Sequence, residues 1–204
     1  MTSDAAAQPE AAVTPASWAT AQLPHLDELL LEQAHLEKKA AAGAVSFLFR
    51  LPLEPRLHRR LSSLAREELV HFERTLKLLA ARGVAFLPQS SSGYAERLKK
   101  AVRKDQSERL VDELLVAAVI ESRSHERMTL LAEATAGRHP DVSAFYSDLC
   151  LAEERHERLY LDLATLVSDA DSVRSRYGEL VQHEAQVLGG LPFCARLHSG
   201  LPDA

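Results

Sequence analysis

The feature that most constrains the fold is a repeated pair of residues, Glu68 with His71 and Glu153 with His156. In each pair the two residues are three positions apart, so they lie on one face of an α-helix. Both pairs occur in long helical patterns that should be buried on one side, and a buried charge is costly unless a partner compensates it. We therefore expect a fold that brings both pairs to a shared, compensating partner.

Prolines and glycines divide the chain into helical segments. Pro55 and Pro140 stand where a first-turn proline begins a helix, and Gly83 and Gly137 stand where a helix ends. Aromatic residues make up only 5% of the chain, and no segment alternates apolar and polar residues with period two, so we predict no sheet. The predicted helices are residues 24–50, 55–82, 94–104, 108–136, 140–167 and 172–188.

The order of these helices predicts the fold. Four long helices form two hairpins, and a long link containing the short helix 94–104 joins the second helix to the third. This order is typical of an all-α, ferritin-like four-helix bundle with one long crossover, here with an additional C-terminal helix. Residues 1–16 are expected to be a disordered tail without the features of a signal peptide, and residues 17–200 to be one domain.

Two further glutamates match the repeated pairs in depth. Glu37 and Glu121 lie on the first and third long helices, 84 residues apart, whereas Glu68 and Glu153 are 85 residues apart. With a rise of 1.5 Å per residue, all four lie roughly 20 Å from their hairpin turns. The sequence therefore predicts that these carboxylates meet at one level of the bundle.

Four carboxylates and two imidazoles at one level are the ligand set of a carboxylate-bridged di-iron or di-manganese centre. If these residues instead formed an ordinary solvated helix face, all of them would be exposed to water. Glu67 is a minor alternative to Glu68, but the repeat aligns it with Ala152. The predicted metal ligands are Glu37, Glu68, His71, Glu121, Glu153 and His156.

Three further residues lie one helical turn from a predicted ligand. Gln33, one turn before Glu37, is a plausible hydrogen-bond partner of the ligands. His125 is expected to support or pack beside the site rather than bind metal, because the repeat gives it no counterpart. Tyr160 can either form a hydrogen bond near the site or fill the core, and we favour the core.

Several segments resemble a known family, the tRNA 2-methylthio-N6-isopentenyladenosine hydroxylases of the MiaE type. The resemblance covers about residues 17–200. It is carried by "HLEKKAAAGAVSFLFR" (35–50), "LAREELVHFERTLKLLAARG" (64–83), "AAVIESRSHERMTLLA" (117–132), "AEERHERLYLDLA" (152–164) and "RLHSG" (196–200).

The resemblance implies a non-haem di-iron monooxygenase with two iron ions per chain. It would use O₂ and two electrons from a separate reductase to hydroxylate the isopentenyl group of the modified adenosine beside the anticodon. Carried over by motif, Glu37 and Glu121 would be terminal ligands, and Glu68 and Glu153 would bridge the irons. Each Glu-x-x-His pair would supply one imidazole nitrogen to one iron.

A tRNA substrate requires local positive charge, because the net charge of the chain is −5. The candidates for tRNA binding are Arg97, Lys99, Lys100, Arg103 and Lys104, with a second basic stretch at residues 56–60. We give equal weight to the possibility that these are ordinary solvated helix faces.

The remaining expectations concern location and alternative functions. Two cysteines and no long apolar run are typical of a cytoplasmic protein, which we expect to be a monomer or small oligomer without membrane contact. The main alternative function is a ferritin-like di-iron oxidase or peroxidase that acts on a small molecule. Iron storage and a metal-free helical interaction module are further alternatives.

Overall fold

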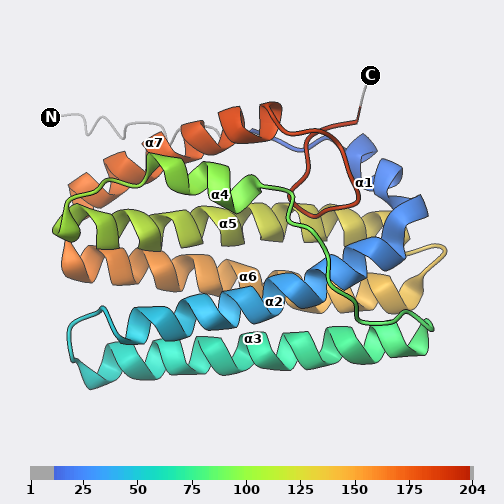
Figure 1. The fold of residues 1–204 in the computed structure, drawn as a ribbon, viewed down its shortest axis with the longest axis horizontal. Helices are drawn as coiled ribbons and strands as arrows, with labels where there is room; N and C mark the ends of the chain where they lie inside the picture. Colours follow the sequence, from blue (N-terminus) through green and yellow to red (C-terminus); the bar gives the residue numbers. More distant parts are fainter. Residues whose placement is uncertain (1–11, 203–204) are drawn as a thin grey trace, which may run out of the picture.

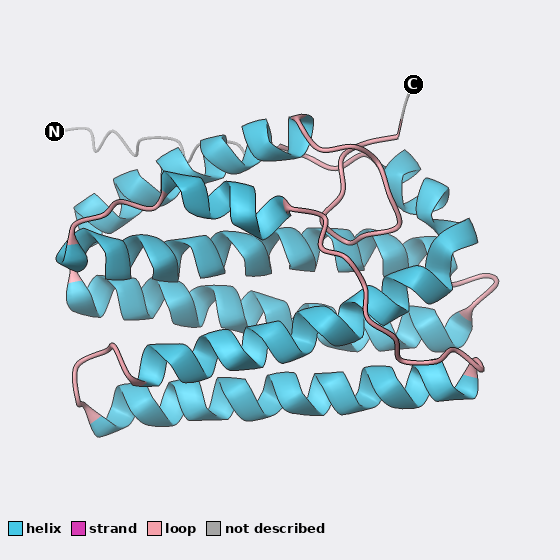
Figure 2. Cartoon of the chain, viewed as in Figure 1, coloured by secondary structure: helices cyan, strands magenta, loops and turns pink. Residues whose placement is uncertain are grey.

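A computed structural model describes residues 12–202, and all regular structure in that range is helical (Figures 1 and 2). Two short 3-10 helices, η1 (Leu23–His25) and η2 (Lys99–Ala101), accompany the α-helices. The α-helices are α1 (Ala16–Gln22), α2 (Leu26–Leu48), α3 (Pro55–Ala81), α4 (Tyr94–Leu98), α5 (Gln106–Thr135), α6 (Pro140–Val167) and α7 (Ala170–Gly189).

The four long helices form the predicted bundle. α2 packs against α3 and α5 packs against α6, and the link from α3 to α5 runs the length of the bundle and carries α4 (Figure 1). α1 and α7 both pack on α5, and α4 packs on α7. The prediction of a ferritin-like bundle with one crossover and an additional C-terminal helix is confirmed.

Local sequence signals explain most of the helix boundaries. Pro55 and Pro140 occupy the first turns of α3 and α6. Asp105 caps α5 by accepting a hydrogen bond from the backbone N–H of Ser107, which satisfies one of the free donors at the helix start. Gly83 follows α3 with φ of +71°, a left-handed conformation that glycine adopts readily.

Three boundaries differ from the prediction. Helix α1 was not predicted, and the predicted helix 94–104 already ends as an α-helix at Leu98, with η2 continuing to Ala101. Residues 1–11 of the predicted disordered tail lie outside the described residues. Residues 12–16 are otherwise exposed, but Thr14 is buried, and its backbone N–H and hydroxyl both donate to Glu126 on α5.

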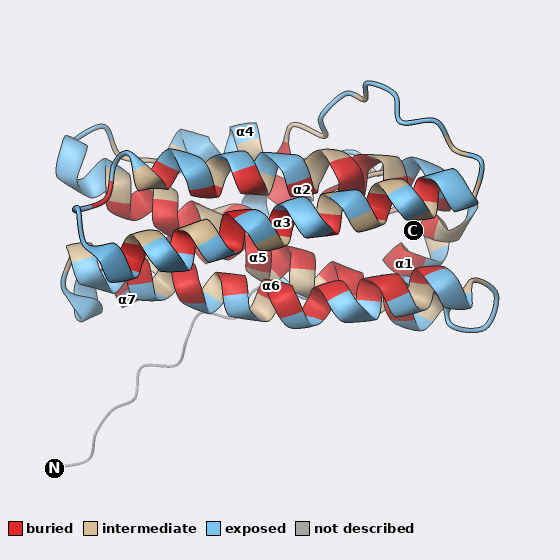
Figure 3. Ribbon diagram, turned by 90° about the horizontal axis from the view of Figure 1, so that it is seen from below, coloured by how far each residue is buried: buried red, intermediate tan, exposed pale blue. Residues whose placement is uncertain are grey.

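The core consists of two apolar clusters with a polar layer between them. The buried faces of the helices point inward along the whole bundle (Figure 3). One cluster contains Phe47 and Leu61, and the other contains Leu30 and Leu79. On both α2 and α3 a buried glutamate lies between these clusters, so the bundle holds its charges at mid-length. No helix within residues 12–202 is long and apolar enough to cross a membrane.

Candidate metal centre and its access cavity

The six predicted metal ligands are all buried, with exposed fractions of 6% or less. They come from the four long helices: Glu37 from α2, the first Glu-x-x-His pair from α3, Glu121 from α5 and the second pair from α6. The reading in which they form a solvated helix face therefore does not hold for these residues.

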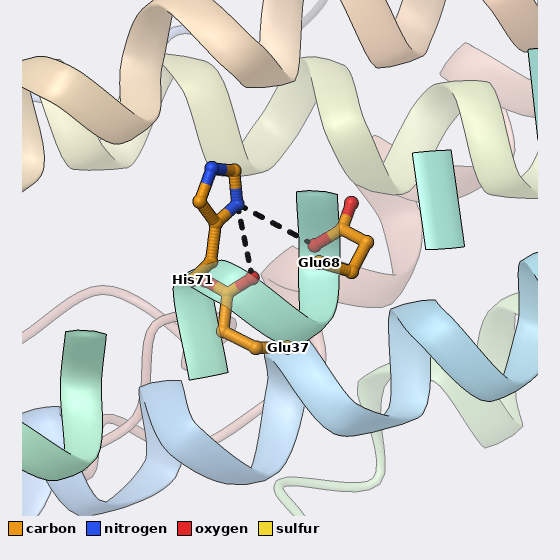
Figure 4. Close-up of side chains that lie close together, drawn as sticks. All are labelled: Glu37, Glu68 and His71. Atoms are coloured by element: carbon orange, nitrogen blue, oxygen red, sulfur yellow. Dashed lines mark ion pairs between the residues drawn. The ribbon is translucent and has the colours of Figure 1, made fainter. Parts of the chain in front are cut away.

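The first group of close ligand atoms joins α2 to α3 (Figure 4). Nδ1 of His71 lies 3.5 Å from Oε2 of Glu37 and 3.7 Å from Oε2 of Glu68. One ligand atom from each residue lies within 4.8 Å of the others. This spacing is compatible with one cation contacting all three side chains.

The second group joins α3 to α5 and α6. Glu68, Glu121 and His156 also place one ligand atom each within 4.8 Å of one another, and Nδ1 of His156 lies 2.8 Å from Oε1 of Glu68. Glu68 belongs to both groups, so its two oxygens face two different imidazoles. The buried Glu153 lies beside Glu121, and their charges interact.

Many polar atoms of this layer have no hydrogen-bond partner, and a cation could serve as their partner instead. Nine buried side-chain polar atoms have no hydrogen-bond partner in the part of the chain that the structure describes. Five of the nine belong to the predicted ligands: both oxygens of Glu68, Oε2 of Glu153, and Nδ1 of His71 and of His156. Unpaired buried polar groups are costly, so this donor set fits the binding of divalent cations.

The pKa values of the layer support the same conclusion. Burial, together with the charges of Glu121 and Glu37, raises the pKa of Glu68 well above its ordinary value. Burial and the neighbouring Glu121 raise the pKa of Glu153 in the same way. Burial alone would lower the pKa of His71, but the nearby carboxylates of Glu37 and Glu68 raise it to about 9. Protons thus compensate the crowded charges where cations would otherwise do so.

Two neighbouring side chains orient the ligands. Gln33 donates a hydrogen bond of 2.5 Å to Oε1 of Glu37, as its position one turn earlier predicted. Oε2 of Glu67 lies 3.2 Å from Nε2 of His156, and Glu67 also pairs with Arg155. An acceptor at Nε2 favours the proton on that nitrogen and leaves Nδ1 of His156 free for a cation. Helical spacing had related Glu67 only to His71, so this contact across to α6 was missed.

His125 and Tyr160 both lie near the predicted ligands, but neither belongs to a ligand group. Nδ1 of His125 lies 2.9 Å from the carbonyl oxygen of Cys150, so this imidazole links α5 to α6 and is not in either ligand group. Tyr160 is buried in the apolar core, where its ring lies 5.8 Å from that of Phe47, as favoured. It also lines the cavity described next.

A cavity of about 1090 Å³ extends from the buried carboxylates to the surface between α2, α5 and the crossover link. This volume is slightly above the range of roughly 300–1,000 Å³ found for small-molecule sites. The four glutamates of the ligand layer line its inner end, and apolar side chains such as Phe47, Val116 and Ile120 line its walls. Exposed lysines and arginines line its outer end.

Comparison with known proteins decides the family. The sequence model of the family described as tRNA-(MS2IO6A)-hydroxylase (MiaE) matches residues 6–199. The chain belongs to the MiaE family. The prediction of this family, and with it of a tRNA-modifying hydroxylase of the oxygen-dependent oxidoreductase class, is confirmed.

Individual members show how closely the chain is related. The tRNA 2-(methylsulfanyl)-N(6)-isopentenyladenosine(37) hydroxylase of Pseudomonas putida is 37% identical over 198 residues, which cover 94% of this chain and 92% of that protein. The enzyme of the same name from Salmonella typhimurium is 37% identical over 147 residues, which cover 71% of this chain and 52% of that protein.

A protein of known structure is also similar to this chain in sequence and fold. "Protein 43 with aldehyde deformylating oxygenase activity from Synechococcus" has a TM-score of 0.88 and 40% sequence identity, and the match covers 97% of this chain and 98% of that chain.

The basic residues predicted to bind tRNA differ in their partners and in whether they line the cavity. Arg97 donates a hydrogen bond of 2.8 Å to the carbonyl oxygen of Gly190, and Arg103 pairs with Asp112 and Glu108. Lys100 is exposed and does not line the cavity. Lys99, Arg103 and Lys104 do line it. Sequence alone could not separate these positions, because the segment has no regular face after Ala101.

The C-terminal segment that carries the motif "RLHSG" lies beside the cavity. His198 is buried, lines the cavity and stacks on Tyr94 with ring centroids 4.4 Å apart. Its Nε2 lies 3.2 Å from Oγ of Ser124. Burial, with the charges of Arg127 and Arg123, lowers the pKa of His198 well below its ordinary value, so the imidazole is neutral. The resemblance drew attention to this residue, but nothing in the sequence indicated its position.

Proposed function

We propose that the chain hydroxylates the isopentenyl group of 2-methylthio-N6-isopentenyladenosine next to the anticodon of tRNA, using O₂ and two electrons. The observation that carries this proposal is the cavity, because it joins a buried carboxylate and imidazole layer to a basic surface through apolar walls. A prenylated nucleotide matches this arrangement, because it has an apolar chain at one end and phosphates at the other.

The proposed cofactor is a pair of iron ions per chain. Glu37 and Glu121 are proposed as terminal ligands, and Glu68 and Glu153 as bridging ligands; the presence of Glu68 in both groups of close ligand atoms supports its role. Bound iron would supply the activation of O₂ that side chains cannot provide. The full proposed set is Glu37, Glu68, His71, Glu121, Glu153 and His156.

Other residues of the chain orient and shield the site. Gln33 holds the carboxylate of Glu37, and Glu67 fixes the ring of His156 from the outer side of the bundle. Phe47 and Ile120 line the path to the carboxylates and exclude water from it. An apolar path favours entry of an isopentenyl chain and holds its methyl groups near the ligand layer.

The same proposal includes the partners. Lys99, Lys100 and Lys104, with Arg97 and Arg103, remain the sequence-based candidates for contacts with tRNA. The chain would act in the cytoplasm, where its tRNA substrate is found, and a separate reductase would supply the electrons.

A direct assay tests this function. Iron-loaded protein is incubated with O₂, a reducing system and an anticodon stem–loop that carries the isopentenyl modification, and the nucleosides are then weighed by mass spectrometry. We expect the modified adenosine to gain the mass of one oxygen atom only when iron and the reducing system are present. An unchanged nucleoside, with two irons per chain confirmed, would contradict the proposal.

A second candidate is an oxygenase acting on aldehydes. It is favoured by the 40% identity to the Synechococcus protein, which is described as having aldehyde deformylating oxygenase activity, and by the apolar walls of the cavity. The same iron-loaded protein would be incubated with O₂, the reducing system and a long-chain aldehyde. The hydrocarbon one carbon shorter would be measured by gas chromatography, with the lost carbon released as formate. Hydrocarbon formation without any change in the RNA nucleoside would favour this candidate over the tRNA hydroxylase.

A further inference from the structure

Three lysines at the outer end of the cavity hold unpaired charges. Lys39 comes from α2, Lys99 from η2 and Lys104 from the link between η2 and α5. All three line the cavity and are exposed. Within residues 12–202, none of them forms a hydrogen bond or an ion pair through its side chain. They therefore present free positive charge from two sides of one opening.

The arginines at the same opening are already engaged in ion pairs. Arg103 forms ion pairs with Asp112 and Glu108, and Asp112 is fully buried. Arg50 and Arg109 both pair with Glu113. An anion that approaches the cavity would therefore gain most from the lysines, because the arginines would first have to give up their carboxylate partners.

The net negative charge of the molecule increases the importance of these lysines for binding an anion. The chain carries a net charge of −5, so a polyanion is repelled from the protein as a whole. A few free cations around one opening then determine where and in which orientation such a ligand binds.

We propose that Lys39, Lys99 and Lys104 form a phosphate clamp, which contacts the RNA backbone on both sides of the nucleotide whose base enters the cavity. The inference rests on the proposed function and identifies how that site holds its substrate. Enzymes that act on a base take it out of the stack, so the phosphates beside that base remain at the opening. Phosphate contacts from lysine fix position without reading sequence.

The clamp differs from the basic segment that the sequence predicted. It adds Lys39, which lies 60 residues before Lys99 in the chain and approaches from the other side of the cavity. It leaves out Arg97, which is bound to the carbonyl oxygen of Gly190, and Lys100, which does not line the cavity.

Matched charge-removing variants test the clamp in the iron-loaded protein. The test pairs are Lys39→Gln with Lys99→Gln, and Lys39→Gln with Lys104→Gln. The control pair is Lys38→Gln with Lys77→Gln, which removes two charges from exposed lysines that do not line the cavity. Each protein is assayed on the modified anticodon stem–loop and on the free modified nucleoside, which has no phosphate. Binding of the stem–loop is measured by fluorescence anisotropy over a range of KCl concentrations.

The clamp predicts a loss specific to RNA. The Kd for the stem–loop should rise about tenfold in each test pair, and the slope of log K against log salt should become shallower by about 1.5, the value for two lost phosphate contacts. Turnover of the free nucleoside should stay within about twofold of the unaltered protein, as should all values for the control pair. Equal losses in test and control pairs, or equal losses on RNA and nucleoside, would overturn the clamp.

The two proposals can fail separately. If the unaltered protein hydroxylates the stem–loop and the test pairs do so equally well, the clamp is wrong and the proposed function stands. If RNA binds with the lysine-dependent salt slope but neither substrate is hydroxylated, the clamp stands and the proposed function is wrong. If the unaltered protein does not bind the stem–loop at all, the clamp is overturned.

Discussion

At the scale of single residues, Glu68 is the centre of the proposed metal layer. Its two oxygens face His71 and His156 from one buried carboxylate, and neither oxygen has a hydrogen-bond partner within residues 12–202. The other carboxylates of the layer raise its pKa further. Such a group is unfavourable on its own, and its position between two imidazoles is explained by a pair of cations that it would bridge.

Replacing Glu68 should therefore remove metal without removing the fold. We expect Glu68→Ala and Glu68→Gln to lower bound iron from two ions to fewer than one per chain, measured by elemental analysis, and to abolish hydroxylation. Metal-free Glu68→Gln should keep the helical circular dichroism of the metal-free parent, because the amide has the size of the carboxyl group and adds no charge to a layer in which burial raises the pKa of Glu68. The control is Glu154→Gln, a half-exposed neighbour that pairs with Arg158 and should retain both ions. Two ions in either Glu68 variant would remove the bridging assignment.

Glu32 gives a pH-dependent prediction away from the ligands. Burial raises its pKa to about 7, although its Oε2 accepts a hydrogen bond of 2.5 Å from the backbone N–H of Leu197. The unfolded chain releases this proton near pH 4.5, so between pH 4.5 and 7 the folded state holds a proton that the unfolded state has lost. Stability from this group is thus complete below pH 4.5 and falls as pH rises to 7, by roughly 3 kcal/mol in total.

Glu32→Gln should lack this decline. Urea unfolding of both proteins in the metal-free state at pH 5 and pH 7.5 measures the difference, and the variant should gain stability relative to the parent at the higher pH. A stability difference that does not change between the two pH values would contradict the raised pKa of Glu32.

At the scale of elements, the C-terminal segment is held by residues distant in sequence. Nε1 of Trp18 on α1 donates to Oγ of Ser199, and Gln22 donates to the carbonyl oxygen of Cys194. Arg127 on α5 donates to the carbonyl oxygens of Leu197 and Ser199. These contacts fix an irregular segment that has little local structure of its own.

Gly200 is the position in this segment with the least space. A Cβ added there would lie 1.8 Å from the carbonyl oxygen of Leu191, so Gly200→Ala must displace backbone. We expect a loss of about 1–3 kcal/mol in the free energy of unfolding, measured in urea. Gly189→Ala is the control, since a Cβ there meets nothing within 4 Å at the end of α7 and should leave stability unchanged or slightly higher. Equal stability of Gly200→Ala and the parent protein would show that the segment can move away without cost.

The long helices were predictable because their signals are local. Pro55 and Pro140 mark the beginnings of α3 and α6, and the Glu-x-x-His spacing identifies their inner faces. α1 and the buried position of Thr14 were missed, because partners distant in sequence stabilise them. The end of α4 was also misplaced, since Arg103 leaves the helical pattern to pair with Asp112 on α5.

At the scale of the whole molecule, the two hairpins bring the duplicated spacing to one level. Equal depth along each hairpin was visible in the sequence, so the composition of the buried layer could be predicted. The partners around that layer could not, because Glu67 contacts His156 across two helices that are distant in sequence. Which cations at the opening are free and which are paired likewise could not be predicted from sequence. Lys39 and Lys104 line the same cavity only because α2 packs beside the crossover link.

The cavity connects these scales, since it begins at the buried carboxylates and opens between α2 and the crossover link, which are distant in sequence. The central claim is that this path delivers the isopentenyl group of a tRNA nucleotide to a metal layer that activates O₂. The claim concerns both the substrate and the origin of the new oxygen atom.

The most direct measurement is the reaction of iron-loaded protein with the modified stem–loop under ¹⁸O₂, followed by mass spectrometry of the released nucleosides. The account predicts one ¹⁸O atom in the isopentenyl group of the modified adenosine for the unaltered protein and none for Glu68→Ala. An unlabelled or unchanged nucleoside from the unaltered protein, with iron bound and electrons supplied, would contradict it.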